Sequence, residues 1–364
     1  MSGWIEKLPS GRFRARYRGP DGARHSIIVA TKAEAKTFLA GAHTDLNRGH
    51  WIDPRGGEET VADWATRWAE ARVIRESTRS TDDGRLRTRI LPTFGPMPLK
   101  DVTPLVVRSW VAHMVADDLS PKTVRHYFML LSLMMKDAVR EGLLLHNPCE
   151  GARLPQLQRT EQRALDPAEL ERLIGALDEW WRPLVMTAVG TGMRWGELAG
   201  LRPERVDLLH RRVIVSETLT EVNGTLVKGP PKSRRSQRVI TLPVQAVEAL
   251  TAALARPHGE YVFGTAAGCA LRRHNFTKRV WQPATEAADV AGLRFHDLRH
   301  THVALLIAGG VPLKAIQDRL GHESITTTID RYGHLLASVD TQLIDTLETQ
   351  LSGRTVPAVR AVSD

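Results

Sequence analysis

The chain has 364 residues and a formal net charge of +9, from 50 Lys and Arg against 41 Asp and Glu. This length predicts two or three domains. Cys149 and Cys269 are too few for a disulfide framework or a four-cysteine zinc site. No secretory signal and no apolar run of the ~20 residues that cross a bilayer is visible. The positive charge favours a polyanionic partner such as nucleic acid, although many ordinary enzymes are also mildly basic.

Residues 1–57 contain ten Lys or Arg and five acidic residues, a net charge of +5. Basic and apolar residues alternate from 12 to 18, which predicts a strand with one basic face. A turn over 19–22, a return strand over 25–29 and a helix over 32–48, capped by Thr31, should complete a small sheet plus one helix. The basic face suits a β-ribbon in a DNA groove, with a solvated strand face as the alternative. Its residues are Arg12, Arg14, Arg16 and Arg18.

Residues 60–150 are expected to be all-helical, with helices after Thr60, from 104 to 115, and from 121 to about 141. The longest apolar stretch, 128–135, is expected to be core, with a protein–protein surface as the alternative. Residues 151–164 are predicted to be a linker. Residues 165–351 should form a larger domain of helices and strands, the strands at 213–216, 219–227 and 238–242, followed by a disordered tail over 352–364.

The larger domain contains four separated signals of chemistry. The first is a glycine-rich turn at 190–192, after which a helix that carries Arg194 can begin; an arginine beside free backbone N–H groups makes an anion site. The glycines match nucleotide-binding loops only loosely, because the spacing of those loops is absent. The second signal is Lys232, in a basic loop between two strands, where a lysine commonly contacts phosphate.

The third signal is the segment from His296 to His302. On a helix, His296, Arg299 and His300 share one face. His296 and His300 also have the i, i+4 spacing of a zinc helix, but Asp297 stands where a metalloprotease has Glu, and Arg299 would place a cation beside the metal. We therefore expect no metal here.

The fourth signal is Leu-Gly-His322, followed by Tyr332. The chain has only four tyrosines, and the neighbours of Tyr332 are too polar for a typical buried aromatic residue. Two arginines, two histidines, a lysine and a tyrosine suit chemistry on a phosphodiester. The guanidinium groups can clamp nonbridging oxygens, His and Lys can move protons, and a tyrosine surrounded by cations can act as a nucleophile.

Arg194, Lys232, His296-x-x-Arg299, Leu-Gly-His322 and Tyr332 together resemble the signature of the tyrosine recombinases, the phage integrase family, over residues 165–340. Their joint order and spacing are specific, although each motif alone is weak. The resemblance implies a multidomain fold that is mainly α with small β-sheets. It has an arm-type DNA-binding domain of β-sheet plus helix (1–57), a helical, SAM-like core-binding domain (60–150) and an α+β catalytic domain (165–351). The arm domain is typical of integrases from temperate phages and integrative elements.

The resemblance also implies a role for each residue. Tyr332 would attack the scissile phosphate and form a 3′-phosphotyrosyl link, while Arg194 and Arg299 hold the phosphate. Lys232 would protonate the leaving 5′ oxygen, His296 would assist as acid or base, and His322 would hydrogen-bond the phosphate. Glu197 would orient an arginine, and His300 would be a supporting, structural residue. No cofactor, metal or ATP is expected.

The partners implied are double-stranded DNA at core and arm attachment sites, three further copies of the chain in a homotetramer, and host DNA-bending and directionality factors. Action in the cytoplasm of a bacterial host, at the nucleoid and away from membranes, would follow. The segment 335–351 is predicted to be an amphipathic helix that docks either on a neighbouring subunit or on its own domain.

Two other functions share these features. A type IB topoisomerase uses a similar residue set, but the short chain and the basic N-terminal strand favour a recombinase. A DNA-binding regulator that has lost catalysis would not need the complete set. We therefore expect a site-specific recombinase that integrates, and possibly excises, phage or mobile-element DNA.

Overall fold

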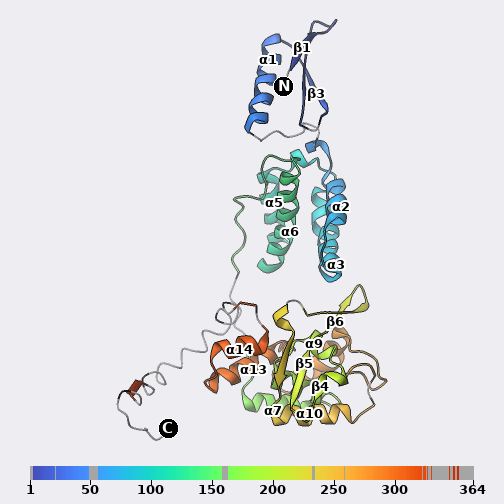
Figure 1. Cartoon of the computed structure of the whole chain (residues 1–364), viewed down its shortest axis with the longest axis vertical. Helices are drawn as coiled ribbons and strands as arrows, with labels where there is room; N and C mark the ends of the chain where they lie inside the picture. Colours follow the sequence, from blue (N-terminus) through green and yellow to red (C-terminus); the bar gives the residue numbers. More distant parts are fainter. Residues whose placement is uncertain are drawn as a thin grey trace. The chain divides into compact units, whose positions relative to one another are not determined.

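The computed structural model describes residues 3–20, 22–48, 56–157, 163–231, 234–257 and 259–321, and residues 323, 324, 326, 329, 344, 347, 348 and 351. The chain divides into two compact units, residues 1–159 and 160–364, and Figure 1 shows the elements of each. The first unit contains a small sheet with a helix and, further along the chain, a group of helices.

The N-terminal sheet consists of three antiparallel strands in the order β1-β2-β3, with helix α1 packed on it; their bounds are β1 (Trp4–Lys7), β2 (Phe13–Arg18), β3 (Arg24–Val29) and α1 (Lys32–Arg48). Ala15 and Tyr17 of β2 are buried, and the Tyr17 ring lies 5.8 Å from that of Phe38 on α1. The arginines that alternate with them point to the opposite face. The predicted strands over 12–18 and 25–29 and the helix over 32–48 are confirmed, whereas β1 was not predicted.

The second part of this unit is all-helical, as predicted. Its elements are η1 (Gly56–Glu58), α2 (Val61–Ala71), α3 (Glu76–Arg85), η2 (Leu86–Ile90), α4 (Leu91–Phe94), η3 (Leu99–Asp101), α5 (Pro104–Ala116) and α6 (Pro121–Arg140). Thr60, Thr103 and Ser120 cap α2, α5 and α6 with their side chains. Most of the apolar stretch over 128–135 is core, as predicted, but Met129 and Leu133 are 64% and 40% exposed.

The second unit combines helices with two small sheets. Its elements are α7 (Pro167–Ala176), α8 (Arg182–Thr191), α9 (Trp195–Ala199), η4 (Pro203–Arg205), β4 (Val206–Asp207), β5 (Arg212–Val215), β6 (Thr218–Val222), β7 (Thr225–Gly229), η5 (Arg234–Ser236), β8 (Arg238–Thr241), α10 (Val244–Leu254), α11 (Arg273–Phe276), η6 (Thr277–Trp281), α12 (Gln282–Ala287), α13 (Asp297–Ala308) and α14 (Leu313–Leu320). The strands form one antiparallel sheet, β4-β5-β8, and one hairpin, β6-β7. A continuous apolar core joins α7, α8, the β5-β8 pair, α10 and the start of α13.

The segment 219–227, expected as one strand, is a hairpin. Asn223 and Gly224 take left-handed backbone conformations, with φ of 49° and 78°. An Asn-Gly pair in this conformation forms the two-residue turn that reverses the chain between paired strands. The prediction overlooked this turn signal inside the apolar pattern.

Several predicted features lie outside the described residues. These are the tail over 352–364, residues 158–162 of the linker, and all of the segment 335–351 except Ile344, Leu347, Glu348 and Leu351. In the part of the chain that is described, no helix has both the length and the apolar character needed to cross a membrane.

Candidate active site

Arg194 follows a tight turn that depends on glycine. Helix α8 ends at Gly192, whose φ is 65°, and a Cβ atom added to Gly192 would lie 2.6 Å from Cδ2 of His302. Both the left-handed conformation and this close approach require glycine. Arg194 then stands immediately before α9, as the N-cap residue, so the helix begins where the sequence predicts.

Glu197 anchors Arg194 in two ways. Its carboxylate accepts hydrogen bonds from the backbone N–H of Arg194, at 2.9 Å, and from Nη1 of the Arg194 side chain, at 3.0 Å. The Glu197 side chain is 1% exposed and that of Arg194 is 37% exposed. The guanidinium group of Arg194 therefore reaches the surface, while the buried carboxylate of Glu197 holds it from the interior side. This is the contact predicted for Glu197.

A second arginine, Arg238 on β8, binds the same carboxylate through Nη1 and Nη2, at 3.2 and 2.9 Å. Burial alone would raise the pKa of Glu197, but the charges and hydrogen bonds of Arg238 and Arg194 outweigh this effect and lower the pKa. Glu197 is therefore ionised at neutral pH. Sequence reasoning gave Arg238 no role, although it precedes the apolar Ile240 by two positions, and such residues share one face of a strand.

Arg299, on the first turn of α13, ties two chain turns together. Its Nη1 donates to the carbonyl of Gly192, at 2.6 Å, and its Nη2 donates to the carbonyl of Leu320, at 2.8 Å. Only 2% of the residue is exposed. Arg299 therefore places its positive charge under the turn that carries Arg194, and it also fixes the end of α14.

The start of α13 brings the two predicted histidines together. His296 is the N-cap residue, and its ring meets that of His300 edge-on, with centroids 5.2 Å apart. His300 is buried. Among the described residues, no group of three His, Cys, Asp or Glu side chains is arranged to hold a metal ion.

His302, two residues after His300 on α13, is held as a neutral ring. Its Nδ1 lies 2.6 Å from the carbonyl of Val189, and its Nε2 accepts a hydrogen bond from Nε of Arg319, at 3.0 Å. Burial, aided by the charge of Arg319, lowers the pKa of His302 to about 3. His302 thus supports the Gly192 turn instead of moving protons.

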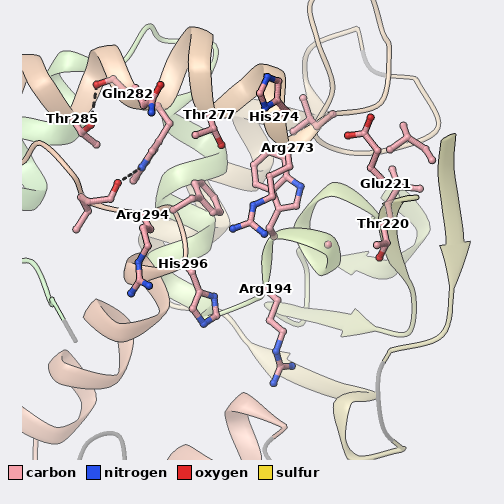
Figure 2. Close-up of a pocket in the computed structure, with 18 of the residues that line it drawn as sticks. Arg194, Thr220, Glu221, Arg273, His274, Thr277, Gln282, Thr285, Arg294 and His296 are labelled. Carbon is pink, nitrogen blue, oxygen red and sulfur yellow. Dashed lines mark hydrogen bonds between the residues drawn. The ribbon is translucent and has the colours of Figure 1, made fainter. Parts of the chain in front are cut away.

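A pocket of about 980 Å³ opens beside Arg194 and His296. Figure 2 shows these two side chains extending from neighbouring elements at the same end of the pocket. The β6-β7 hairpin forms one wall and α11, η6 and α12 form another, with polar lining residues that include Thr220, Arg273 and Gln282. Arg194 and His296 can therefore both be reached from this pocket.

The structure brings Arg194, Glu197 and Arg299 together around the α8–α9 turn, and His296 shares the pocket with Arg194. Lys232, His322 and Tyr332 lie outside the described residues. Gly321, directly before His322, ends α14 in a left-handed conformation, with φ of 65°. The four arm arginines lie in the other unit, and Arg16 forms an ion pair with Glu6, at 3.3 Å.

Comparison with protein families matches three models along the chain. The model described as "Phage integrase family" matches residues 163–338. The model described as "Phage integrase, N-terminal SAM-like domain" matches 60–115, and the one described as "Phage integrase, N-terminal domain" matches 1–48. Among curated relatives, the integrase of Mycobacterium phage L5 is 28% identical over 342 residues, which cover 88% of this chain and 91% of the phage protein.

Two solved structures share the fold. The Tn1549 transposon integrase in complex with a circular intermediate DNA has a TM-score of 0.70 at 20% identity, covering 79% of this chain and 99% of that one. The lambda integrase tetramer bound to a Holliday junction has a TM-score of 0.57 at 19% identity, covering 89% and 94%. With its family matches along both units and the predicted residues around one turn, the chain belongs to the phage integrase family.

Proposed function

We propose that this protein is a tyrosine-type site-specific recombinase that cleaves and rejoins duplex DNA to integrate phage or mobile-element DNA. The observation that carries the proposal is the meeting of Arg194 and Arg299 at the α8–α9 turn, with His296 in the adjoining pocket. Two guanidinium groups, one half-buried and one fully buried, supply fixed positive charge where a phosphate gains negative charge in the transition state.

In the proposed reaction, Tyr332 passes its phenolic proton to His296, acting as the base, and its oxygen forms a bond to phosphorus. The bond from phosphorus to the 5′ oxygen breaks, and that oxygen takes up a proton from Lys232 to become a free 5′-hydroxyl. Arg194 and Arg299 stabilise the charge on the nonbridging oxygens, His296 assists proton transfer, and His322 hydrogen-bonds the phosphate. A 5′-hydroxyl from the partner duplex then attacks the phosphotyrosyl bond, so the energy of the broken bond is retained and no ATP is required.

Strand exchange of this kind joins two duplexes and uses four active sites, which supports a homotetramer on DNA. The lambda integrase structure with a Holliday junction is such a tetramer. We extend the proposal to core sites bound by the helical domain, arm sites bound by the N-terminal sheet, host DNA-bending and directionality factors, and action at the nucleoid in the bacterial cytoplasm. The segment 335–351 remains proposed to dock on a neighbouring subunit or on its own domain.

A nicked duplex that carries the core attachment site tests the proposal. Cleavage beside the nick releases a short strand and traps the covalent protein–DNA adduct. We expect the full chain to form this adduct in EDTA and without ATP, and we expect Tyr332→Phe to abolish it, because phenylalanine has no oxygen to bond to phosphorus.

The control is Tyr127→Phe, which removes a phenolic hydroxyl that lies 3.1 Å from Oγ1 of Thr88 in the helical domain. This variant should form the adduct at the wild-type rate. An adduct that survives in Tyr332→Phe would show that another residue is the nucleophile.

A further inference from the structure

Arg238 is a buried cation that the reaction described above does not use. It is the first residue of β8, its side chain is 6% exposed, and it lies on the same face of the strand as the buried Ile240, while Val239 between them is 60% exposed. An arginine is rarely buried unless its hydrogen bonds are met. The contacts of Arg238 therefore indicate why it is there.

The first set of contacts leads to Arg194. Nη1 and Nη2 of Arg238 bind the two carboxylate oxygens of Glu197 as a fork, and the same two oxygens hold the side chain and the backbone N–H of Arg194. Bidentate arginine–carboxylate pairs fix geometry as well as charge. Arg238 therefore sets the position of the carboxylate on which Arg194 rests.

The second set of contacts leads to two neighbouring segments of chain. Nε of Arg238 donates to the carbonyl of Arg319 near the end of α14, at 2.7 Å, and Nη1 also donates to the carbonyl of Ser236, at 2.9 Å. Arg319 precedes His322 by three positions, and Ser236 follows Lys232 by four.

The two segments are also packed directly on each other. Arg235 donates to the carbonyl of Glu323, at 2.8 Å, and a Cβ atom on Gly321 would lie 2.8 Å from the carbonyl oxygen of Arg235. The backbone just after Lys232 and the backbone on either side of His322 therefore form one junction. Arg238 links this junction to α9.

We propose that Arg238 is a positioning residue for the phosphate clamp: it fixes Arg194 through Glu197, and it anchors this clamp to the end of α14 through the Arg319 carbonyl. This inference rests on the proposed function, because it assumes that Arg194 binds the scissile phosphate. A displacement of a catalytic group by about 1 Å can cost on the order of a hundredfold in rate. A rigid guanidinium that joins three segments prevents such displacement.

The test uses Arg238→Lys in the full chain. Lysine keeps the positive charge but lacks the planar fork, so it cannot bind Glu197 and the Arg319 carbonyl in the same way. Single-turnover cleavage rates are measured on two nicked duplexes, one with the normal scissile phosphodiester and one with a methylphosphonate. The methylphosphonate has a methyl group in place of one nonbridging oxygen and is uncharged, so its cleavage depends less on Arg194.

We expect Arg238→Lys to slow cleavage of the phosphodiester by about tenfold or more and cleavage of the methylphosphonate by less than about threefold, each relative to wild type on the same duplex. Arg194→Ala serves as the reference and should show the same selectivity with a larger loss. Arg212→Lys is the matched control, because Arg212 lies on the neighbouring strand β5 with its side chain 49% exposed and paired with Asp207. It should leave both rates unchanged.

The inference would be overturned if Arg238→Lys lost the same factor on both duplexes, because such a loss does not depend on the charge of the phosphate. It would also be overturned if Arg238→Lys cleaved both duplexes as fast as Arg212→Lys does. If Arg238→Lys does not fold, Glu197→Gln tests the same link from its other end and should show the same selectivity. Failure of the proposed function is distinct: wild-type protein would then form no Tyr332-dependent adduct on the phosphodiester duplex.

Discussion

At the residue scale, burial separates charged side chains that only decorate the surface from those that shape the active site. Arg212 and Asp207 form a surface pair of the kind that contributes little to stability, because water screens both charges. Arg238 and Glu197 are almost fully buried, and removing one partner of such a pair leaves an uncompensated charge that costs about 3–5 kcal/mol. Because Glu197 also binds Arg194, the geometry of this buried pair determines where Arg194 lies.

The buried neutral ring of His302 makes stability depend on pH. The unfolded chain binds a proton on this histidine near pH 6.5, but the folded chain does so only near pH 3, so the unfolded state holds more protons between these values. Stability should therefore fall on acidification through this window, by up to about 1.4 kcal/mol per pH unit from this group. The contribution of the neutral His302 ring to stability is fully present above about pH 6.5.

Urea unfolding of wild type and His302→Gln at pH 7, 6 and 5 checks this expectation. The substitution should lower stability at pH 7 and flatten its decline towards pH 5. His146→Gln, at an exposed position, should keep the wild-type slope. Equal slopes in wild type and His302→Gln would show that His302 does not remain neutral in the folded state.

Sequence reasoning found Arg194, His296 and Arg299 because each belongs to a short motif whose spacing is visible along the chain. Glu197 was assigned to an arginine because it follows Arg194 by three positions. Arg238 was not found, since its partner Glu197 lies 41 positions earlier in the sequence and only the fold brings them together. Long-range ion pairs of this kind leave no periodic signal.

At the element scale, helices with a capping residue and an apolar stripe were predicted well. Thr31, Thr103 and Ser120 each precede a helix whose start matches the prediction. Helix α3 was missed because its sequence is almost wholly polar, and its one buried residue, Asp82, is held by an ion pair with Arg72, at 2.8 Å. Strand β1 was missed because four residues are too few to show alternation.

Strand β2 allows a prediction about arm-site binding. Its basic face is turned away from α1, and each arginine that contacts a phosphate adds about 0.9 to the slope of log affinity against log salt. Replacing Arg12, Arg14 and Arg18 together by Gln should therefore weaken binding of the full chain to arm-site duplex. It should also reduce the salt slope by about 2 to 3.

The matched control is Arg16→Gln, because Arg16 is already paired with Glu6 and should contribute less. Titrations at several salt concentrations, with a core-site duplex as a second substrate, measure both slopes. An unchanged slope on the arm duplex would remove the N-terminal sheet from DNA binding. If the salt slope fell on the core-site duplex alone, the arginines would contact the core site and not the arm site.

At the scale of the whole molecule, the positive charge is divided between two regions of the chain. A net +5 of the total +9 falls in residues 1–57, where it is spread over a small sheet and helix. In the second unit, Arg194, Arg238 and Arg299 matter by position, because each is fixed by named hydrogen bonds around one turn. The order of motifs along the sequence predicted the reaction, whereas the supporting network became visible only in the fold.

The most direct test of the central claim identifies the residue that carries the DNA. The trapped adduct is digested with nuclease and trypsin, and the peptides are sequenced by mass spectrometry. We predict a nucleotide attached through its 3′ phosphate to Tyr332, in the peptide 332–354 that follows Arg331. A nucleotide on any other residue, or one attached through its 5′ phosphate, would contradict the proposed mechanism.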